Sequence, residues 1–348
     1  MERAAETAET KIRLVARWDL DKTYLRTEFD TVRDLVRTAV ERPDRKRSVP
    51  GAAALLRELK RAGARVHILS GSPRQMRGRL EEKLAIDRVR YDELTLKPNL
   101  SNALRLRFRA MRDQLGYKLP SLLAARARDQ HLGRSPGELA EILVGDDAEA
   151  DAFVYSLYAD VCAGRVEHAL LTRVLEKGRV YSDQAELALS SQRQLVPATT
   201  VSRILIHLDR QTPPSRFHEF GPRVVPFYNY LQAAIVLFAD GHVSAEGVLR
   251  VASELVQQHR FDADALARSY FELVRRGHVV KSPVEPLRRV LGELEGRLPT
   301  LNELTAMVDQ LGRREVEPGA PVDERPIDYV ALSEIHRGGK NRRRPGAR

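Results

Sequence analysis

The sequence contains a single cysteine and no apolar run long enough to cross a membrane. Cys162 alone excludes an intrachain disulfide framework and is too little for a cysteine-rich zinc site. The longest apolar stretch, Leu231 to Ala239, is about half the length of a membrane-spanning helix. The N-terminus is polar and of mixed charge, without the apolar core of a secretory signal. We therefore expect a cytoplasmic protein with no transmembrane segment.

Histidine pairs at metal-ligand spacing are also missing. The nine histidines form no HxH or HxxxH pair, which argues against a histidine-based transition-metal site. In contrast, 43% of the residues are hydrophobic and 30% are charged, which is sufficient for a packed core and unlike a disordered chain. A length of 348 residues favours two domains of ordinary size.

The charge of the chain is strongly positive, with 58 Lys and Arg against 48 Asp and Glu and a net charge of +10. Such an excess favours anionic partners, namely a phosphorylated substrate, an anionic lipid surface or nucleic acid. Part of it lies in residues 337–348, which carry six Arg or Lys and no acid. We predict that residues 331–348 form a basic disordered tail, an interpretation preferred over specific nucleic-acid recognition.

The first half of the chain has the pattern of a parallel α/β unit. Residues 12–18 alternate loosely between polar and apolar and predict a strand. A helical period follows Pro50 and ends near Gly63, and residues 65–69 predict a second strand. Strand, crossover helix and strand make a βαβ unit and hence a parallel sheet. Residues 141–144 are another short apolar run that is typical of a buried strand.

The second half shows helical periodicity and no convincing strand. Residues 211–226 contain four prolines and predict a linker. Helices are expected at residues 227–238, 245–258, 263–276, 286–295 and 301–311. The predicted organisation is an α/β domain over residues 1–165, an all-α domain of unknown role over residues 166–330, and the tail.

Polar side chains follow each of the three predicted strands of the first half. Asp19 and Asp21 follow the first strand, Ser70 the second, and Gly145-Asp-Asp147 the third. The carboxyl ends of parallel strands converge at one edge of a sheet, so these groups are expected in one pocket. Asp19 is placed to attack phosphorus as a nucleophile, and Asp21 to protonate the leaving oxygen and then activate water.

Two carboxylates repel a phosphate dianion unless a cation lies between them, which predicts Mg²⁺ as the cofactor. The ligands expected for it are Asp19, Asp21, Asp146, Asp147 and Asp151. The Ser70 hydroxyl and the backbone N–H groups of Gly71 and Ser72 are placed to hold phosphate oxygens. A lysine is needed to offset the charge of a phosphoaspartate.

This order of groups resembles the haloacid dehalogenase (HAD) superfamily of phosphohydrolases over about residues 12–165. The family's first motif, DxDx(T/V), matches Asp19, Asp21 and Thr23. Its second motif matches Ser70, and its acidic fourth motif matches the aspartates between Gly145 and Asp151. The resemblance implies a Rossmannoid parallel sheet, a phosphoaspartate intermediate and a contact of Thr23 with substrate.

A narrower similarity is to the catalytic domain of App1-type phosphatidate phosphatases. It rests on Val49-Pro-Gly-Ala52, Leu69-Ser-Gly-Ser-Pro73 and Leu143-Val-Gly-Asp-Asp147, and departs at Gly71, where Asn is usual, and at Ala152, where Pro is usual. In that family an aromatic residue or His precedes the third-motif lysine, which selects Lys118 over Lys97. Only about 25 residues separate the first motif from the first helix, which implies a minimal cap.

The predicted function is therefore a Mg²⁺-dependent phosphatase that acts on a phosphomonoester of a bulky substrate such as a phosphatidate-like lipid. Two alternatives stay open. One is a catalytically idle HAD scaffold that serves as an interaction protein; the other is a phosphatase acting on nucleic acid ends. A DxD-type glycosyltransferase also uses an aspartate pair, but it leaves Ser70 and the Gly145-Asp-Asp147 loop unexplained.

Overall fold

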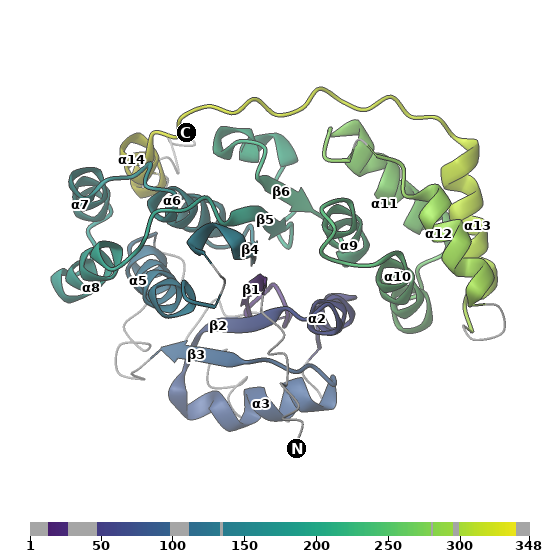
Figure 1. Cartoon of the computed structure of the whole chain (residues 1–348), viewed down its shortest axis with the longest axis horizontal. Helices are drawn as coiled ribbons and strands as arrows, with labels where there is room; N and C mark the ends of the chain where they lie inside the picture. The colour runs from purple at the N-terminus through teal and green to yellow at the C-terminus, as the bar shows by residue number, and fades with distance from the viewer. Residues whose placement is uncertain are drawn as a thin grey trace, which may run out of the picture.

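A sheet of six parallel strands runs through the centre of the computed structural model (Figure 1). The structure describes residues 13–26, 47–97, 111–132, 135–279, 281–294 and 299–338. The strands are β1 (Leu14–Asp19), β2 (Arg65–Pro73), β3 (Glu93–Lys97), β4 (Ala140–Asp146), β5 (Val201–His207) and β6 (Val224–Phe227). Their order is β3-β2-β1-β4-β5-β6, and every neighbouring pair is parallel. The predicted α/β class and parallel sheet are confirmed.

The strand order reverses direction between β1 and β4, which lie side by side. From β1 the chain first builds outward through β2 to β3, and then returns to the other side of β1 with β4, β5 and β6. A crevice at the carboxyl ends of two strands is expected at such a switch point, and ligands bind there in open α/β sheets. Asp19 ends β1 and Asp146 ends β4, so both lie at this point.

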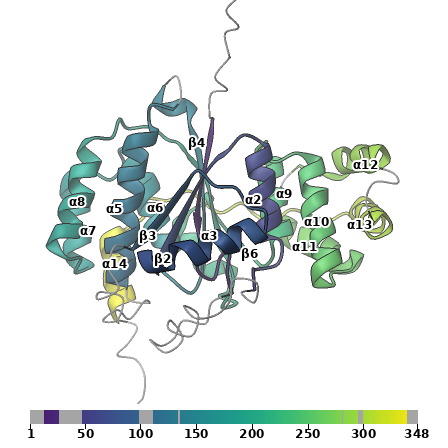
Figure 2. The same cartoon turned by 90° about the horizontal axis from the view of Figure 1, so that it is seen from below.

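Helices cover both faces of the sheet (Figure 2). One face packs against α5 (Met111–Asp129) and α6 (Asp151–Cys162), and α7 (His168–Lys177) and α8 (Ser182–Arg193) lie outward of these two helices (Figure 1). The other face packs against α2 (Ala52–Arg61), α9 (Tyr230–Ala239) and α10 (Ala245–His259), which are followed outward by α11 (Ala263–Arg275), α12 (Val284–Glu293) and α13 (Leu301–Arg313). Strand side chains alternate between the two cores, as the period of two requires.

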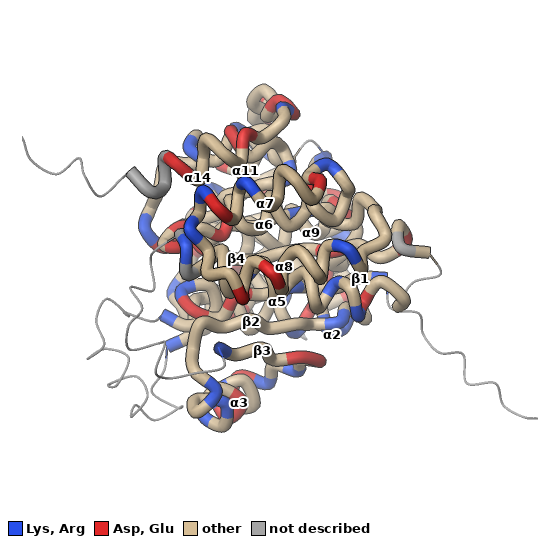
Figure 3. The backbone as a smooth tube through the Cα atoms, turned by 90° about the vertical axis from the view of Figure 1, so that its left-hand side faces the viewer, with Lys and Arg blue, Asp and Glu red and all other residues tan. Residues whose placement is uncertain are grey.

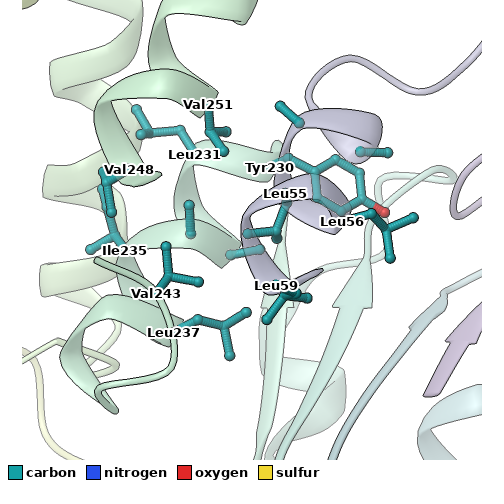
Figure 4. Close-up of a cluster of buried hydrophobic side chains, with 14 of the residues drawn as sticks. Leu55, Leu56, Leu59, Tyr230, Leu231, Ile235, Leu237, Val243, Val248 and Val251 are labelled. Carbon is teal, nitrogen blue, oxygen red and sulfur yellow. The ribbon is translucent and has the colours of Figure 1, made fainter. Parts of the chain in front are cut away.

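The core between α2, α9 and α10 is assembled from both halves of the sequence (Figure 4). Leu55 and Leu59 of α2 face Leu231 and Ile235 of α9, and Val248 of α10 packs behind them. All five side chains are buried. Burial of each aliphatic side chain contributes about 1.5–3 kcal/mol, so the second half of the chain stabilises the sheet directly.

The prediction of an all-α second half is wrong, because β5 and β6 extend the sheet beyond residue 165. Two features of the sequence hid them. Ser202 and Arg203 interrupt the apolar run of β5, and Arg203 is accommodated by an ion pair with Asp240 at 2.6 Å. β6 is a four-residue edge strand with Pro226 inside it, and edge strands tolerate proline because one side needs no ladder hydrogen bond. The expected linker thus contains a strand.

The predicted disordered tail is also wrong over residues 331–338, which belong to α14 (Tyr329–Gly338). Residues 314–328 run without regular structure from α13 across the molecule to α14, which lies beside α7 (Figure 1). The Tyr329 hydroxyl donates to Asp160 at 2.6 Å, and Lys177 pairs with Glu334 at 2.7 Å. Residues 339–348 lie outside the described residues. No described helix combines the length and apolarity that crossing a membrane requires.

Arg17 lies fully buried at the centre of an ionic network on the sheet face that α5 and α6 cover. Its Nε donates to Glu141 at 2.6 Å, and its Nη2 donates to Asp129 at 3.2 Å. Glu141 also accepts hydrogen bonds from the hydroxyls of Tyr158 and Thr200, at 2.7 and 2.8 Å. Both carboxylate oxygens of Glu141 are thus engaged, so its loss leaves the buried Arg17 guanidinium with only the longer contact to Asp129.

We expect Glu141→Ala to lower the free energy of unfolding by about 3–5 kcal/mol, because it leaves the Arg17 charge buried without its main partner. Urea denaturation at pH 7 measures the loss. The double variant Arg17→Met/Glu141→Leu is the matched control and is expected to recover part of the stability. It removes both charges of the main pair, while the buried charges of Arg126, which lies 3.4 Å from Glu141, and of Asp129 remain. A loss below about 1 kcal/mol in Glu141→Ala would show that the network does not stabilise the fold.

Candidate active site

Asp19 occupies the carboxyl end of β1, where only 1% of its surface is exposed. The next strand, β4, ends in Asp146, which is buried to the same degree. β1 and β4 are in register up to the pair Trp18 and Val144, so both aspartates leave the sheet at one edge. The structure therefore brings together the two strand ends that the sequence placed in one pocket.

Lys118 projects from α5 to this edge and is also 1% exposed. Its Nζ lies 3.1 Å from Asp19 Oδ1 and 2.8 Å from Glu149 Oε2, and it forms a shorter contact with Asp151 Oδ1. Of the two lysines considered from the sequence, Lys118 is the one that reaches Asp19. The ammonium of Lys97 lies instead 5.2 Å from the centre of the Tyr117 ring.

Four carboxylates, those of Asp19, Asp146, Glu149 and Asp151, form a cluster, with one oxygen of each within 4.8 Å of the others. The turn between β4 and α6 folds back on Asp146, whose Oδ1 accepts the backbone N–H groups of Ala148 and Glu149 at 2.6 and 3.1 Å. Gly145 is required beside it, because a Cβ there would lie 2.3 Å from Asp151 Oδ2. Sequence reasoning missed Glu149, although it stands between two predicted ligands.

Two of the predicted metal ligands lie outside this cluster. Both carboxylate oxygens of Asp147 accept backbone N–H groups of the loop after β5, from Arg210 at 2.7 Å and Thr212 at 2.9 Å. Asp147 therefore orders that loop. Asp21 lies beyond the end of β1, and its Oδ2 accepts the Ser70 hydroxyl at 3.0 Å. Its carboxylate faces β2, whereas the cluster lies on the side of β4.

Ser70, Gly71 and Ser72 lie within β2, which continues to Pro73 instead of ending at Leu69 as expected. The pairing with β3 shifts register between Ser70 and Pro73, and such a bulge changes the direction of side chains at a sheet edge. The Ser72 N–H donates to Ser70 Oγ at 3.0 Å, and Tyr117 donates to the Ser70 carbonyl at 2.8 Å. A Cβ at Gly71 would contact Asp21 at an ordinary 3.9 Å, so this position is open.

The loop that carries Asp21 is held by the second half of the chain. The Tyr230 hydroxyl donates to the Thr23 carbonyl at 2.5 Å, and the Tyr230 ring stacks on Trp18 with 5.6 Å between centroids. His207 Nδ1 lies 3.2 Å from the Lys22 carbonyl, which can only accept, so Nδ1 carries the hydrogen. The Thr23 hydroxyl donates back to Asp19 Oδ2 at 3.5 Å. Residues of β5 and α9 therefore position the loop after β1.

Burial and mutual repulsion dominate the electrostatics of the cluster. Burial raises the pKa of Asp19, Asp146 and Asp151, and their carboxylate neighbours raise it further, while Lys118 opposes the rise. Burial alone would lower the pKa of Lys118, but the carboxylates of Asp151, Asp19 and Glu149 raise it well above its ordinary value. A single lysine thus faces four buried or half-buried acids.

The cluster fits a hard divalent cation. Its donors are all carboxylate oxygens, which Mg²⁺ and Ca²⁺ prefer, and one ammonium leaves an excess of negative charge. Asp146 Oδ2 is buried without a hydrogen-bond partner among the described residues, which is costly unless a ligand engages it. A bound cation would satisfy this oxygen and favour the ionised form of each carboxylate.

The raised pKa of Asp146 predicts a pH-dependent stability for the metal-free protein. The native state holds a proton that the unfolded state releases at its ordinary pKa, so stability falls as the pH rises from that value through the native pKa. Asp146→Asn keeps the acceptor for the two backbone N–H groups and carries no titratable proton. We expect it to unfold at a higher temperature than the wild type at pH 8 in EDTA, with a smaller difference at pH 5.

Added Mg²⁺ is expected to reverse that order at pH 8. At a concentration of about 100 times its Kd, Mg²⁺ adds about 2.7 kcal/mol to the stability of the wild type, and Asp146→Asn gains much less. Thermal unfolding with a Mg²⁺ titration measures both effects. Equal stabilisation of the two proteins by Mg²⁺ would show that Asp146 is not a ligand.

Comparison with known proteins does not assign the chain to a family. No family model matches the sequence, and no curated protein matches it. A solved structure described as "Structure of Pnkp1/Rnl/Hen1 complex" contains a chain that is 18% identical, with 45% of this chain and 48% of that chain covered and a TM-score of 0.26. This chain thus spans about half the length of that one. A similarity at this TM-score carries no argument, so the HAD resemblance stays a prediction.

Proposed function

We propose that the protein is a Mg²⁺-dependent phosphohydrolase of the HAD type, in which Asp19 is the nucleophile. One observation carries the proposal: the Asp19 carboxylate lies at the strand switch point between a buried lysine and a carboxylate cluster. Asp21 follows two residues later and is held by Ser70 on the other side. A nucleophile, an acid or base, a cationic side chain and a cation site are thus gathered at one edge of the sheet.

The reaction proceeds by two displacements at phosphorus. An oxygen of Asp19 attacks the phosphomonoester, the bond to the ester oxygen breaks, and Asp21 gives that oxygen a proton, which releases the alcohol and leaves an acyl phosphate on Asp19. Asp21 then takes a proton from water, whose oxygen attacks phosphorus and restores the Asp19 carboxylate with release of phosphate. Asp19 and Asp146 would hold Mg²⁺, whose positive charge would offset the phosphoryl oxygens.

The remaining residues hold the phosphoryl group and the loop. Lys118 neutralises charge at Asp19 in both steps, because its ammonium already lies 3.1 Å from Oδ1. Ser70 orients Asp21 in this structure and accepts the Ser72 N–H. In the proposed reaction the Ser70 hydroxyl and the backbone N–H groups of Gly71 and Ser72 exchange their present partners for phosphate oxygens. Thr23 links the loop to Asp19.

The test is hydrolysis of p-nitrophenyl phosphate at pH 7 to 8 with either Mg²⁺ or EDTA. We expect hydrolysis to fall at least about 100-fold in EDTA and to recover when Mg²⁺ is restored, since two carboxylates facing a phosphate repel it without a cation. Isothermal titration of the apoprotein with Mg²⁺ gives a second readout that does not depend on the substrate. Hydrolysis at full rate in EDTA, or no Mg²⁺ binding, would contradict the proposal.

A further inference from the structure

A cavity of about 820 Å³ lies beside the loop that carries Asp21. It is bounded by the start of α2, the end of α3 (Arg77–Ile86) and the end of α10, and by residues 26 and 47–50. The Tyr24 and Ser48 hydroxyls both donate to Asp87 Oδ2 in its wall. Tyr24 belongs to the same loop as Asp21. Its hydrogen bond to Asp87 therefore fixes the position of the cavity wall relative to Asp21.

The cavity is strongly basic. Five Lys or Arg line it, namely Arg26, Arg47, Arg57, Lys83 and Arg88, against two acids. Both acids are already paired, Asp87 with Lys83 at 2.8 Å and Glu254 with Arg57 at a shorter distance. No ion pair joins Arg26, Arg47 or Arg88 to an acid among the described residues. Three exposed arginines therefore line the cavity without an acid partner among the described residues.

Arg88 occupies a backbone conformation that glycine adopts more easily. It follows the C-cap of α3 with φ of 57°, in the left-handed region, where a non-glycine residue costs about 1 kcal/mol or more. Helix termination alone favours glycine at this position, so the arginine side chain requires another explanation. Arg88 is one of the residues that line the cavity, where it adds a positive charge that glycine would not supply.

Arg26 connects the cavity with the candidate active site. It follows Leu25, which forms a β-bridge with Asp21. Arg26 also lies two residues after Tyr24, whose hydroxyl donates to Asp87 in the cavity wall. An anion bound in the cavity lies next to the catalytic edge and not on a remote surface.

The chemistry of the lining selects phosphate and disfavours a lipid. Guanidinium groups bind phosphate oxygens in a bidentate manner. A lipid also requires an apolar surface near its headgroup. Among the described residues, the exposed large hydrophobic side chains are Ile86, Tyr181, Leu187 and Val196, and only Ile86 lines the cavity. The other three lie on or beside α8, across the sheet from α2 in two perpendicular views (Figures 1 and 2).

We propose that this cavity binds a backbone phosphodiester of a nucleic acid strand whose terminal phosphate is the group attacked by Asp19, an inference that rests on the proposed function. On the side of the molecule formed by α5, α7, α8 and α14, basic and acidic residues are interspersed (Figure 3). That side therefore lacks a concentration of positive charge comparable to that of the cavity. The lining contains no Phe, Tyr or Trp ring on which a base could stack. The cavity therefore recognises the nucleic acid backbone and does not distinguish base sequences.

The binding test uses a fluorescent oligonucleotide of about six nucleotides with one terminal phosphate, and the 5′ and 3′ isomers are assayed separately. All variants are made in the Asp19→Asn protein, which prevents turnover of the probe. The cavity variant is Arg47→Gln/Arg88→Asn, since Asn tolerates the left-handed backbone. The control variant, Arg173→Gln/Arg193→Gln, removes equal charge from exposed positions on α7 and α8. We expect the cavity variant to bind about tenfold or more weakly and its salt slope to fall by about 0.7 for each lost phosphate contact.

Turnover separates this inference from the proposed function. In the Asp19 background, the ratio of kcat/KM for the oligonucleotide to that for p-nitrophenyl phosphate is expected to fall about tenfold in the cavity variant and to stay constant in the control. Equal loss of oligonucleotide affinity in the two variants would overturn the inference, as would binding of phosphatidate vesicles, instead of the oligonucleotide, through the same arginines. If neither substrate is hydrolysed but the oligonucleotide still binds through the cavity arginines, the proposed function is overturned and the assignment of the cavity as a nucleic acid site stands.

Discussion

Asp19→Asn is expected to reduce kcat for p-nitrophenyl phosphate hydrolysis by about 10⁴-fold or more, because an amide oxygen does not form the acyl phosphate through which both half-reactions pass. The replacement is close in shape, and the amide oxygen can still accept from Lys118, so the loss arises from chemistry and not from a cavity. The measurement is steady-state turnover with saturating Mg²⁺, together with a urea unfolding curve that shows the variant to be folded.

The matched control for that variant is Asp209→Asn. Asp209 is an exposed acid just beyond β5, at the same edge of the sheet, so the change removes one negative charge near the site without touching the cluster. We expect less than a twofold change in kcat. Activity of Asp19→Asn above about one tenth of the wild-type value would exclude Asp19 as the nucleophile, since removal of a nucleophile in other enzymes costs far more.

Lys118→Met is expected to lower the free energy of unfolding of the metal-free protein by about 3–5 kcal/mol at pH 8, because it leaves buried carboxylates without their cation. Loss of the ammonium raises the pKa of Asp19 and Asp151 further, so protonation relieves the repulsion at low pH and the cost shrinks there. Urea denaturation at pH 8 and pH 5 in EDTA measures both parts of this prediction.

The double variant Lys118→Met/Asp151→Asn separates charge from packing. Asp151 forms the shortest contact with Lys118, so removal of its charge is expected to recover part of the lost stability at pH 8. Activity is not expected to return, because Lys118 also serves Asp19 during phosphoryl transfer. A loss below about 1 kcal/mol in the single variant, or a loss that does not depend on pH, would show that Lys118 acts by packing alone.

The sequence predicts the centre of the site because strand ends are local features. Residues 12–18 and 141–144 are predicted as strands, and the polar groups that follow each of them meet because β1 and β4 are parallel neighbours. Ser70 was found in the same way. Lys118 required the family resemblance, since a helix between residues 111 and 129 gives no indication of which of its side chains reaches β1.

The sequence does not predict the contribution of the second half, because that contribution depends on tertiary contacts. β5 contains a half-buried arginine, Arg203, whose charge is compensated by Asp240, 37 residues further along the chain, and no periodicity reveals such a pair. Tyr230 and His207 hold the loop after β1 through backbone carbonyls, which have no sequence signature. Asp147 was predicted as a metal ligand, yet its carboxylate binds two backbone amides.

Transfer of the phosphoryl group to Asp19 is most directly tested by acid quench during turnover, reduction with borohydride and peptide mapping. Borohydride reduces an acyl phosphate to an alcohol, so the modified position is read from the tryptic peptide that spans Trp18 to Lys22. The proposal predicts that the modification lies at Asp19, that it depends on substrate, and that it is absent in Asp19→Asn. A peptide modified at Asp21, or an unmodified peptide from an enzyme that is turning over, would contradict it.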